Sequence, residues 1–466
     1  MAGIKNIGIY IPMYRLSVEE VGGFWGYSKG RGTKAICGWD EDAITMAVSA
    51  GHDCLDDLNE EPKYLILAST TLPYSEKLSA SIVSSALGLS SHTTVCDVTN
   101  SIRSGTIALK LALTLAAEGD VLIIASDCRV PHPGSLLETI TGDGAVSILV
   151  TAKDPDVEVE ATCSEFTSFF DIWKKQRDTY LRSTEARFIF EEGYLPVLQR
   201  VLKNLEERYG YSRKDFEHIV LHGPTNRDVV MAARKLELGR EQLSSTLFEE
   251  IGNTGVAAPF LQLVNTLEYA KEGSRCLLIA YGDGADAFVF RVNRKRTFDI
   301  KKHIRNGVKI NYAKYLQWRR LVELAPTTLW ERPKPSLQTR WRERKTIYLL
   351  AGYKCERCGR IQIHPQGQRV RVCVYCQSKD CFSDYPLCVK KGSLFTYTID
   401  HLQFTLNPPG VNGVVDFEDG GRLLCELTDC KPEELKVGMP VKMSFRVLDE
   451  GEIVNYFWKA KPDKGN

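Results

Sequence analysis

Four cysteines near the C-terminal end of the chain have the spacing of a metal centre. They form two pairs, Cys355 with Cys358 and Cys373 with Cys376, with two residues inside each pair and 14 between the pairs. Two such pairs can close a tetrahedral site of four thiolates around zinc and leave no position open for a substrate. The spacing therefore predicts a structural zinc, whereas four unrelated buried cysteines are the reading that it disfavours.

The overall composition is that of a globular protein. The chain has 466 residues, of which 43% are apolar and 26% charged, as is typical of a globular protein with about three domains and a sizeable core. No uncharged apolar run reaches 18 residues, and the opening MAGIKNIGIYIP is too polar for a signal peptide. We therefore expect a cytoplasmic protein with no membrane partner, in which the 14 cysteines need not form disulfides.

Charge is concentrated in one segment. The formal net charge is +1, but residues 294–345 hold 16 Lys or Arg against 4 Asp or Glu. This basic segment can pack on the acidic remainder of the protein or bind the phosphates of a cofactor. Tryptophans interleave it without any nucleic-acid motif, so no nucleic-acid partner is expected.

Strand and helix signals alternate over the first 296 residues, which predicts an α/β domain. YLILAST at 64–70 is echoed by HIVLHGP at 218–224, and GDGAVSILV at 142–150 by GDGADAFVF at 282–290. Two matching pairs in the same order indicate an internally duplicated fold. Residues 163–209 are expected to form a charged helical layer.

The C-terminal region changes character after a Pro-rich stretch. Five short strand patterns follow the cysteine pairs between residues 391 and 459, which predicts a small OB-type β-barrel after a zinc ribbon. The expected organisation is a duplicated α/β domain at 1–325, a linker at 326–345, a zinc ribbon at 346–389 and an OB fold at 390–466.

Several motifs together resemble the thiolase superfamily, and within it the hydroxymethylglutaryl-CoA synthase and ketoacyl synthase III group. They are IGIYIPMYRL, VTNSIRSGTIALKLA, LIIASD, HGPTNR, IGNTGVAAP and YAKYLQWRRL. The C-terminal region resembles the zinc-ribbon plus OB-fold domain that accompanies such enzymes, often as a separate subunit. The resemblance implies the duplicated thiolase fold and a coenzyme A thioester as ligand.

This resemblance places Ile102 where the family carries its nucleophilic cysteine, at the start of a buried helix. An isoleucine cannot form an acyl intermediate. Ser101 is one residue away and would point in another direction. The family's glutamate general acid corresponds to Thr71. Cys96, Cys128 and Cys163 are not expected to replace the nucleophile, and Cys96 is expected in the core.

Two catalytic residues of the family remain, His222 and Asn253. In the family these residues hold the thioester carbonyl and stabilise an enolate. For His222 alone, a structural role at a strand end is the competing reading. Arg103 at the helix start opposes the helix dipole, so it can either form an inward salt bridge or bind a substrate carboxylate.

Three functions stay open. The first is cysteine-independent retro-aldol, aldol or decarboxylation chemistry on acyl-CoA. The second is a catalytically silent subunit that docks CoA within a thiolase complex, and the third is an ordinary condensing enzyme. We favour C–C bond chemistry next to a thioester within a thiolase complex. The expected partners are a thiolase subunit or a second copy, pairing through the sheet edge at Thr93–Val98.

Overall fold

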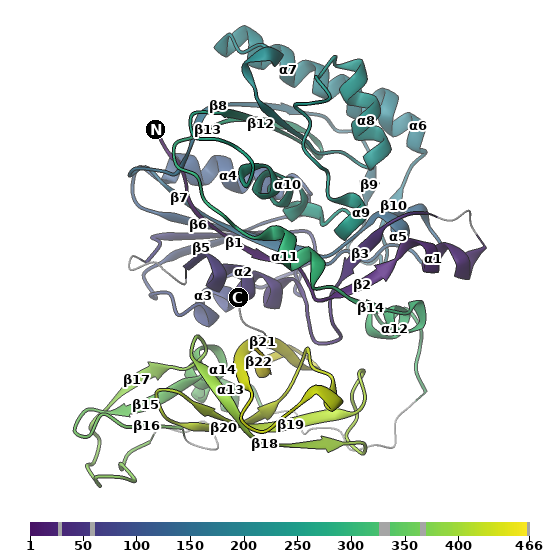
Figure 1. Ribbon diagram of the computed structural model, residues 1–466. Coiled ribbons are helices and arrows are strands. Elements are labelled where there is room, and N and C mark those ends of the chain that lie inside the picture. Colours follow the sequence, from purple (N-terminus) through teal and green to yellow (C-terminus); the bar gives the residue numbers. More distant parts are fainter. Residues whose placement is uncertain (27–29, 56–60, 326–335, 364–369, 464–466) are drawn as a thin grey trace. The chain divides into compact units, whose positions relative to one another are not determined.

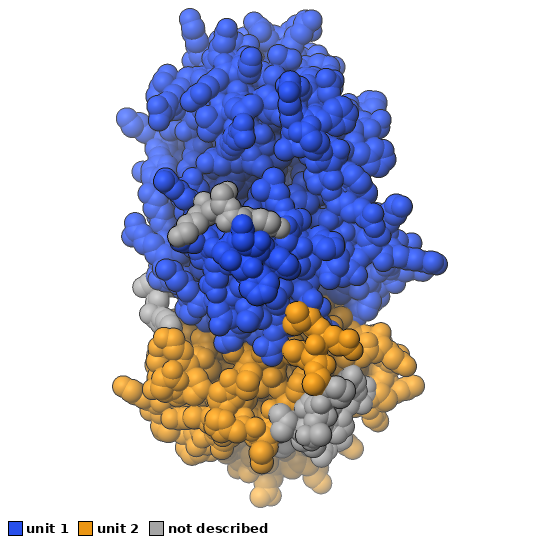
Figure 2. Space-filling view, turned by 90° about the vertical axis from the view of Figure 1, so that its right-hand side faces the viewer, with its two compact units in different colours: residues 1–38, 42–81, 90–321 blue, residues 39–41, 82–89, 322–466 orange. Residues whose placement is uncertain are grey.

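The computed structural model describes residues 1–26, 30–55, 61–325, 336–363 and 370–463. The chain divides into two compact units, coloured separately in Figure 2. The first unit holds residues 1–38, 42–81 and 90–321, and the second holds 39–41, 82–89 and 322–466. The second unit therefore includes two short segments from the N-terminal part of the sequence.

A nine-stranded sheet runs through the first unit in the order β11-β12-β13-β8-β1-β7-β6-β4-β5 (Figure 1). Its two halves meet where β1 pairs with β8 through Gly3–Glu158 and Ile4–Val157. A Cβ on Gly3 would lie 2.2 Å from the Val157 carbonyl oxygen, so only glycine fits this joint. The strands are β1 (Gly3–Tyr10), β4 (Tyr64–Ser69), β5 (Thr94–Thr99), β6 (Val121–Asp127), β7 (Gly144–Thr151), β8 (Val157–Phe166), β11 (His218–Leu221), β12 (Arg275–Tyr281) and β13 (Gly284–Val292).

The strand order confirms the predicted duplication. Counted outward from the joint, β7 and β13 are second in their halves, and β4 and β11 are fourth. These are the strands whose sequences echo each other. The first half has β5 as its fifth strand. At the equivalent position of the second half, the described residues form no strand but a single parallel bridge between Leu243 and Ile219.

Helices and sheet halves alternate in layers (Figure 1). Helices α4 and α10 lie between the two halves, and their apolar side chains share one core with strand residues of both halves. A Cβ on Gly105 of α4 would lie 2.9 Å from the ring of Phe260 of α10. Helix α2 packs on the outer side of the first half, and α7 and α8 cover the second. These helices are α2 (Ala43–Leu55), α4 (Ser104–Leu115), α7 (Leu195–Tyr209), α8 (Asn226–Lys235) and α10 (Ala258–Leu267).

The expected helical layer at residues 163–209 is only partly correct. Residues 163–166 complete β8, and a short hairpin of β9 (Ile172–Trp173) and β10 (Arg182–Ser183) follows. Helix begins at α6 (Ala186–Phe188) and continues through the π-helical turns of η1 (Ile189–Tyr194) into α7. Buried and half-buried residues alternate along most of β8. This period of two marks a strand, and the glutamates at its half-buried positions disguised it.

Shorter elements complete the first unit. A small sheet has the order β14-β2-β3. The remaining elements are β2 (Tyr14–Ser17), α1 (Val18–Trp25), β3 (Thr33–Ile36), α3 (Ala80–Ala86), which continues into the second unit, α5 (Leu136–Ile140), η2 (Arg213–Asp215), α9 (Phe248–Ile251), η3 (Gly255–Ala257), α11 (Ile300–Arg305), β14 (Val308–Ile310) and α12 (Tyr312–Trp318).

The second unit contains the two predicted C-terminal modules. One is a three-stranded sheet of order β16-β15-β17, and the other is a five-stranded sheet of order β20-β19-β18-β21-β22. A bridge from Leu427 to Ala460 brings the two outer strands of the five together, as in an OB-type near-barrel. The strands are β15 (Ala351–Cys355), β16 (Ile361–Gln362), β17 (Phe382–Pro386), β18 (Lys391–Asp400), β19 (Gly410–Phe417), β20 (Arg422–Glu426), β21 (Pro440–Glu450) and β22 (Val454–Pro462), with η4 at Pro432–Glu434.

The expected linker at 326–345 falls partly outside the described residues, which exclude 326–335. Its remainder is largely helical, in α13 (Leu337–Arg342) and the start of α14 (Arg344–Leu349). Among the described residues, no helix combines the length and the apolar character that a membrane crossing requires.

Candidate functional site

His222 directly follows β11. Its backbone N–H donates to the Ile279 carbonyl at 2.9 Å, and its own carbonyl accepts from the Tyr194 hydroxyl at 3.1 Å. Gly223 makes room for this tyrosine, because a Cβ there would lie 2.4 Å from the Tyr194 hydroxyl oxygen. The strand end and the tyrosine thus fix the backbone of His222, whose side chain is buried.

Asn253 comes from a separate segment, the turn between α9 and η3. Its backbone N–H donates to the Ile140 carbonyl at 2.8 Å. The side-chain oxygen accepts from the Gly255 N–H at 3.1 Å, and the side-chain nitrogen reaches the Gly223 carbonyl at 3.4 Å. This last contact joins Asn253 to the loop after His222, so the structure brings the two residues together.

The imidazole of His222 is buried and keeps unused hydrogen-bonding capacity among the described residues. Only 1% of the residue is exposed, and neither ring nitrogen has a hydrogen-bond partner among the described residues. Burial lowers the pKa of His222 to about 4, although Asn253 and the Tyr281 carbonyl lie close enough to oppose this shift. The ring is therefore neutral at neutral pH, and its N–H can donate to an acceptor that enters the site.

Ile102 lies at the start of α4, opposite the second Gly-Asp-Gly turn. A Cβ on Gly282 would lie 2.6 Å from Cγ1 of Ile102, so the aliphatic side chain packs against that glycine. The hydroxyl of the neighbouring Ser101 donates to the Asp283 carboxylate at 2.5 Å, so it is bound to a residue of the same Gly-Asp-Gly turn.

Arg103 forms the inward salt bridge, the first of the two alternatives that the sequence left open. Its guanidinium donates to both carboxylate oxygens of Asp286 at 2.9 and 2.8 Å, and Thr106 donates to the same group at 2.6 Å. Burial would raise the pKa of Asp286, but the hydrogen bonds and charge of Arg103 hold it below its usual value. The charge of Arg103 is therefore neutralised within the protein.

The position assigned to the family's general acid is structural. The Thr71 hydroxyl accepts from the Cys128 N–H at 3.0 Å and donates to the Asp127 carboxylate at 3.1 Å. Burial raises the pKa of the Cys163 thiol and that of Cys96, as expected of inert thiols. Cys96 is nevertheless exposed, because β5 is an edge strand and not part of the core as expected.

Sequence reasoning missed Arg129, which lies just beyond the end of β6. It is buried beside the Asn253 turn, since a Cβ on Gly255 would lie 3.0 Å from Arg129 Cδ. The available signal was a basic residue two positions after the apolar strand LIIASD. At the carboxyl end of a parallel strand, such a residue faces the edge where ligands bind.

The four predicted cysteines come together in the second unit. Their sulfur atoms all lie within 4.8 Å of one another, with Cys355–Cys376 at 3.7 Å and Cys358–Cys373 at 3.6 Å. Zinc–sulfur bonds of about 2.3 Å place tetrahedral sulfurs about 3.8 Å apart. The donor set therefore fits a zinc ion. The Ser378 hydroxyl lowers the pKa of Cys355 to about 6, which favours the thiolate that a metal requires.

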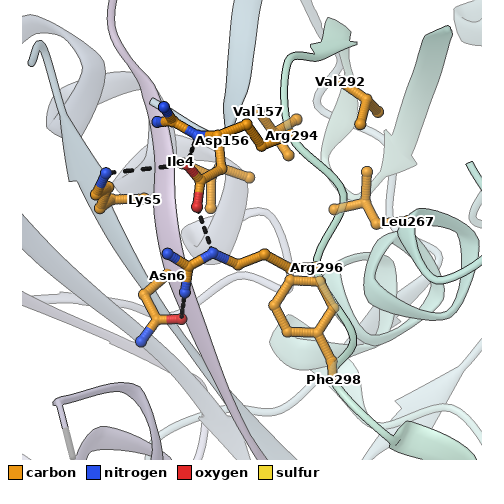
Figure 3. Close-up of a pocket in the computed structure, with 10 residues that line it drawn as sticks. All are labelled: Ile4, Lys5, Asn6, Asp156, Val157, Leu267, Val292, Arg294, Arg296 and Phe298. Atoms are coloured by element: carbon orange, nitrogen blue, oxygen red, sulfur yellow. Dashed lines mark hydrogen bonds and ion pairs between the residues drawn. The ribbon is translucent and has the colours of Figure 1, made fainter. Parts of the chain in front are cut away.

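The beginning of the basic segment packs on acidic residues of its own unit. Figure 3 shows Asp156 between Arg294, Arg296 and Lys5. Arg294 also reaches Asp154 at 2.7 Å. These two arginines accordingly serve the first of the two expected roles, neutralisation of the acidic body.

The duplicated, layered fold of the first unit defines a thiolase-like protein. Residues 206–292 match the family model described as 3-oxoacyl-[acyl-carrier-protein (ACP)] synthase III C terminal. Among solved structures, an HMG-CoA synthase complexed with CoA shares the fold with a TM-score of 0.63 and 21% identity, covering 68% of this chain and 89% of that one. The synthase III of Pseudomonas aeruginosa PAO1 gives a TM-score of 0.57 at 20% identity, covering 63% and 98%.

The chain belongs to the hydroxymethylglutaryl-CoA synthase family. It is 32% identical over 345 residues to the hydroxymethylglutaryl-CoA synthase of Pyrobaculum arsenaticum, covering 69% of this chain and 99% of the relative. The enzyme of Archaeoglobus fulgidus is 31% identical over 344 residues, covering 69% and 100%. Residues 389–446 match the ChsH2 C-terminal OB-fold domain, which confirms the fusion to an OB domain.

Proposed function

We propose that this protein binds an acyl-CoA thioester and makes or breaks a C–C bond next to it without a covalent acyl-enzyme. The observation that carries the proposal is the buried His222 imidazole, which lies beside Asn253 with both ring nitrogens unpartnered among the described residues. A buried polar group without a partner is costly, and a thioester carbonyl oxygen supplies the missing acceptor. A relative in fold whose structure contains CoA supports this class of ligand.

The chemistry follows from two donors aimed at one oxygen. The N–H of His222 and the side-chain amide of Asn253 both donate to the thioester carbonyl. The amide is free to do so because its contact with the Gly223 carbonyl, at 3.4 Å, is long. As charge develops on the oxygen, these fixed donors stabilise the enolate. Retro-aldol cleavage, aldol addition and decarboxylation all pass through such a species.

The absence of a covalent step rests on Ile102. In this proposal Ile102 holds the place of the family's cysteine and closes it with an aliphatic side chain against Gly282. Ser101 does not substitute for the cysteine, because Asp283 holds its hydroxyl. The site keeps the carbonyl donors and lacks the nucleophile.

We further propose that the chain works in a complex of the thiolase type, through the free edge of β5. This strand ends the sheet, and Ile107 and Leu111 on the adjacent α4 are 38% and 44% exposed. An open edge beside apolar side chains is a surface that association covers. This observation also favours the second candidate, a silent subunit that docks CoA for a partner.

In the second unit, Cys355, Cys358, Cys373 and Cys376 would hold a zinc ion. Four thiolates complete its coordination, so the ion stabilises the fold and takes no part in catalysis.

Incubation with isotope-labelled acetyl-CoA, followed by intact-protein mass spectrometry, tests the noncovalent proposal. We expect the unmodified mass. A labelled cysteine would instead identify an ordinary condensing enzyme. Purification from the source organism then separates the remaining two candidates: turnover by the chain alone supports catalysis here, and turnover only through a cysteine-bearing partner supports the silent subunit.

A further inference from the structure

Arg129 is a buried cation for which the described residues offer no hydrogen-bond or ion-pair partner. The residue is 5% exposed, and no described residue accepts a hydrogen bond from its guanidinium or pairs with it within 4.0 Å. The Nε atom is fully enclosed without an acceptor. Burial lowers the pKa of Arg129. An uncompensated buried charge is among the most costly features of a folded protein.

The other buried or half-buried arginines of the first unit each have acceptors for their guanidinium, although the Nε atom of Arg319, like that of Arg129, is enclosed without one. Arg15 donates to three backbone carbonyls. Arg319 donates to two carbonyls and to Asp143, and Arg103 binds both oxygens of Asp286. Each of these guanidinium groups has at least one carboxylate or carbonyl acceptor, whereas the guanidinium of Arg129 has none among the described residues.

The two acids that attract Arg129 electrostatically form their hydrogen bonds with other residues. The Asp127 carboxylate accepts hydrogen bonds from residues of two segments, namely Ser69, Thr70, Thr71 and Val256. Asp171 accepts from the Ile172 N–H at 2.6 Å and from the Tyr281 hydroxyl. Both acids attract Arg129 electrostatically, but neither forms an ion pair with it. The guanidinium thus keeps its capacity for a bidentate acceptor.

Arg129 belongs to the same site as His222 and Asn253. Its Cδ passes over Gly255, whose N–H donates to the Asn253 side chain. A side chain at position 255 would press on Arg129, because a Cβ there would lie 3.0 Å from Arg129 Cδ. After burial, the charge of Arg129 is a further cause that lowers the pKa of His222, so the guanidinium lies within electrostatic range of the imidazole.

We propose that Arg129 binds a carboxylate on the acyl group of the substrate, so that the ligand is the CoA thioester of an acid with a second carboxyl group. This inference rests on the proposed function, in which His222 and Asn253 hold the thioester carbonyl. The pantetheine arm separates the phosphates of CoA from the thioester by a long chain of bonds. An anion beside His222 therefore comes from the acyl side. A planar guanidinium matches a carboxylate in two parallel hydrogen bonds.

Calorimetric titration of the full-length protein with freshly prepared thioesters tests the inference. Two pairs match in chain length and differ in the terminal carboxyl group: succinyl-CoA against butyryl-CoA, and glutaryl-CoA against pentanoyl-CoA. We expect one carboxylated thioester to bind at least about 10-fold more tightly than its partner, the size of a charge-assisted hydrogen bond. Free succinate added with butyryl-CoA distinguishes a carboxylate on the acyl group from a separate acid.

Variants assign the preference to Arg129. Arg129→Met should abolish the preference for the carboxylated thioester, and Arg129→Lys should retain part of it. Arg187→Met, which removes an exposed arginine of the same unit, should keep it in full. The melting temperature of Arg129→Met should not fall, because the variant removes an unpaired buried charge.

The outcomes separate the inference from the proposed function. Equal binding within both pairs, or a preference that survives in Arg129→Met, overturns the carboxylate role while acyl-CoA binding stands. If butyryl-CoA in the presence of free succinate binds as tightly as succinyl-CoA, Arg129 still binds a carboxylate, but that carboxylate need not belong to the acyl group, and this part of the inference is overturned. Failure of every thioester to bind at millimolar concentration overturns both.

Discussion

The cysteine cluster and the proposed thioester site are built in opposite ways. The four thiols come from 22 consecutive residues and lie within 4.8 Å of one another, so their mutual contacts define the site. His222 follows strand β11, whereas Asn253 lies in the turn between α9 and η3, and both leave hydrogen-bonding capacity unused among the described residues. A group of ligands that converge on each other marks a structural ion. Buried polar groups with unused hydrogen-bonding capacity instead point to a ligand.

This contrast predicts that damage to the metal centre is structural and damage to the thioester site is functional. Replacement of Cys373 by Ser should release the zinc and unfold the ribbon, because a structural zinc contributes on the order of 10 kcal/mol to folding. Metal analysis should give one zinc per chain in the wild type and a loss in the variant. Hydrogen exchange should rise in β15–β17 and stay low in β6 and β12.

The matched control is Cys381→Ser, which alters a nearby thiol outside the four-sulfur cluster. It should keep its zinc. Freshly purified wild-type protein without zinc would refute the metal assignment.

Charged residues introduced beside the edge of β5 should weaken association without unfolding the protein. Replacing both Ile107 and Leu111 by Glu should weaken association by roughly 100-fold, because buried interface side chains carry most of the binding energy. Light scattering should show a dimer, or a complex with a thiolase subunit, for the wild type and a monomer for the variant. Val230→Glu alters an equally exposed residue of α8 and should leave association intact. A wild-type monomer that binds no partner would contradict the proposal.

Burial of His222 predicts a loss of stability in acid. Its pKa falls from 6.5 to about 4 on folding. Above pH 6.5 both folded and unfolded states are neutral. Between pH 6.5 and 4 only the unfolded state takes up the proton, so stability falls as the pH falls. From pH 7 to 4.5, urea denaturation should show the wild type losing roughly 2 to 3 kcal/mol more than His222→Gln. Equal losses in both proteins would mean that the ring is accessible to solvent.

Ile102→Cys tests the proposal that only a nucleophile at position 102 separates this site from a covalent one. The helix dipole at the start of α4 belongs to the backbone and should lower the pKa of the introduced thiol. With acetyl-CoA we expect slow acylation of the variant, measured as a mass increase confined to the peptide that contains residue 102. Label at Cys96 or Cys128 in the wild type would show that another thiol serves the site.

Much of the fold could be predicted from the sequence because its signals are local. The apolar runs at 64–68 and 121–126 are the buried strands β4 and β6, and the echoed Gly-Asp-Gly segments mark equivalent strands of the two halves. Strand β8 was missed where glutamates interrupt the apolar pattern, and Cys96 was placed in the core because a sequence does not reveal which strand ends a sheet.

The site could be predicted only in part. The cysteine spacing indicates a metal centre directly, and family motifs indicate His222 and Asn253. Neither source shows that Arg103 meets Asp286 from across the fold or that Arg129 meets no acceptor among the described residues. Partners of this kind depend on tertiary contacts between segments more than 100 residues apart.

Calorimetry with a thioester and its carbonyl-free analogue tests the central claim most directly. Butyryl-CoA and the thioether butyl-CoA differ in the one oxygen that His222 and Asn253 are proposed to hold. Because a lost hydrogen bond to a buried donor amounts to about 1.4 kcal/mol or more, the wild type should bind butyryl-CoA at least about 10-fold more tightly. In His222→Ala this difference should largely vanish while butyl-CoA binds as before. Equal affinities for the two ligands in the wild type, or a difference that survives in His222→Ala, would contradict the account.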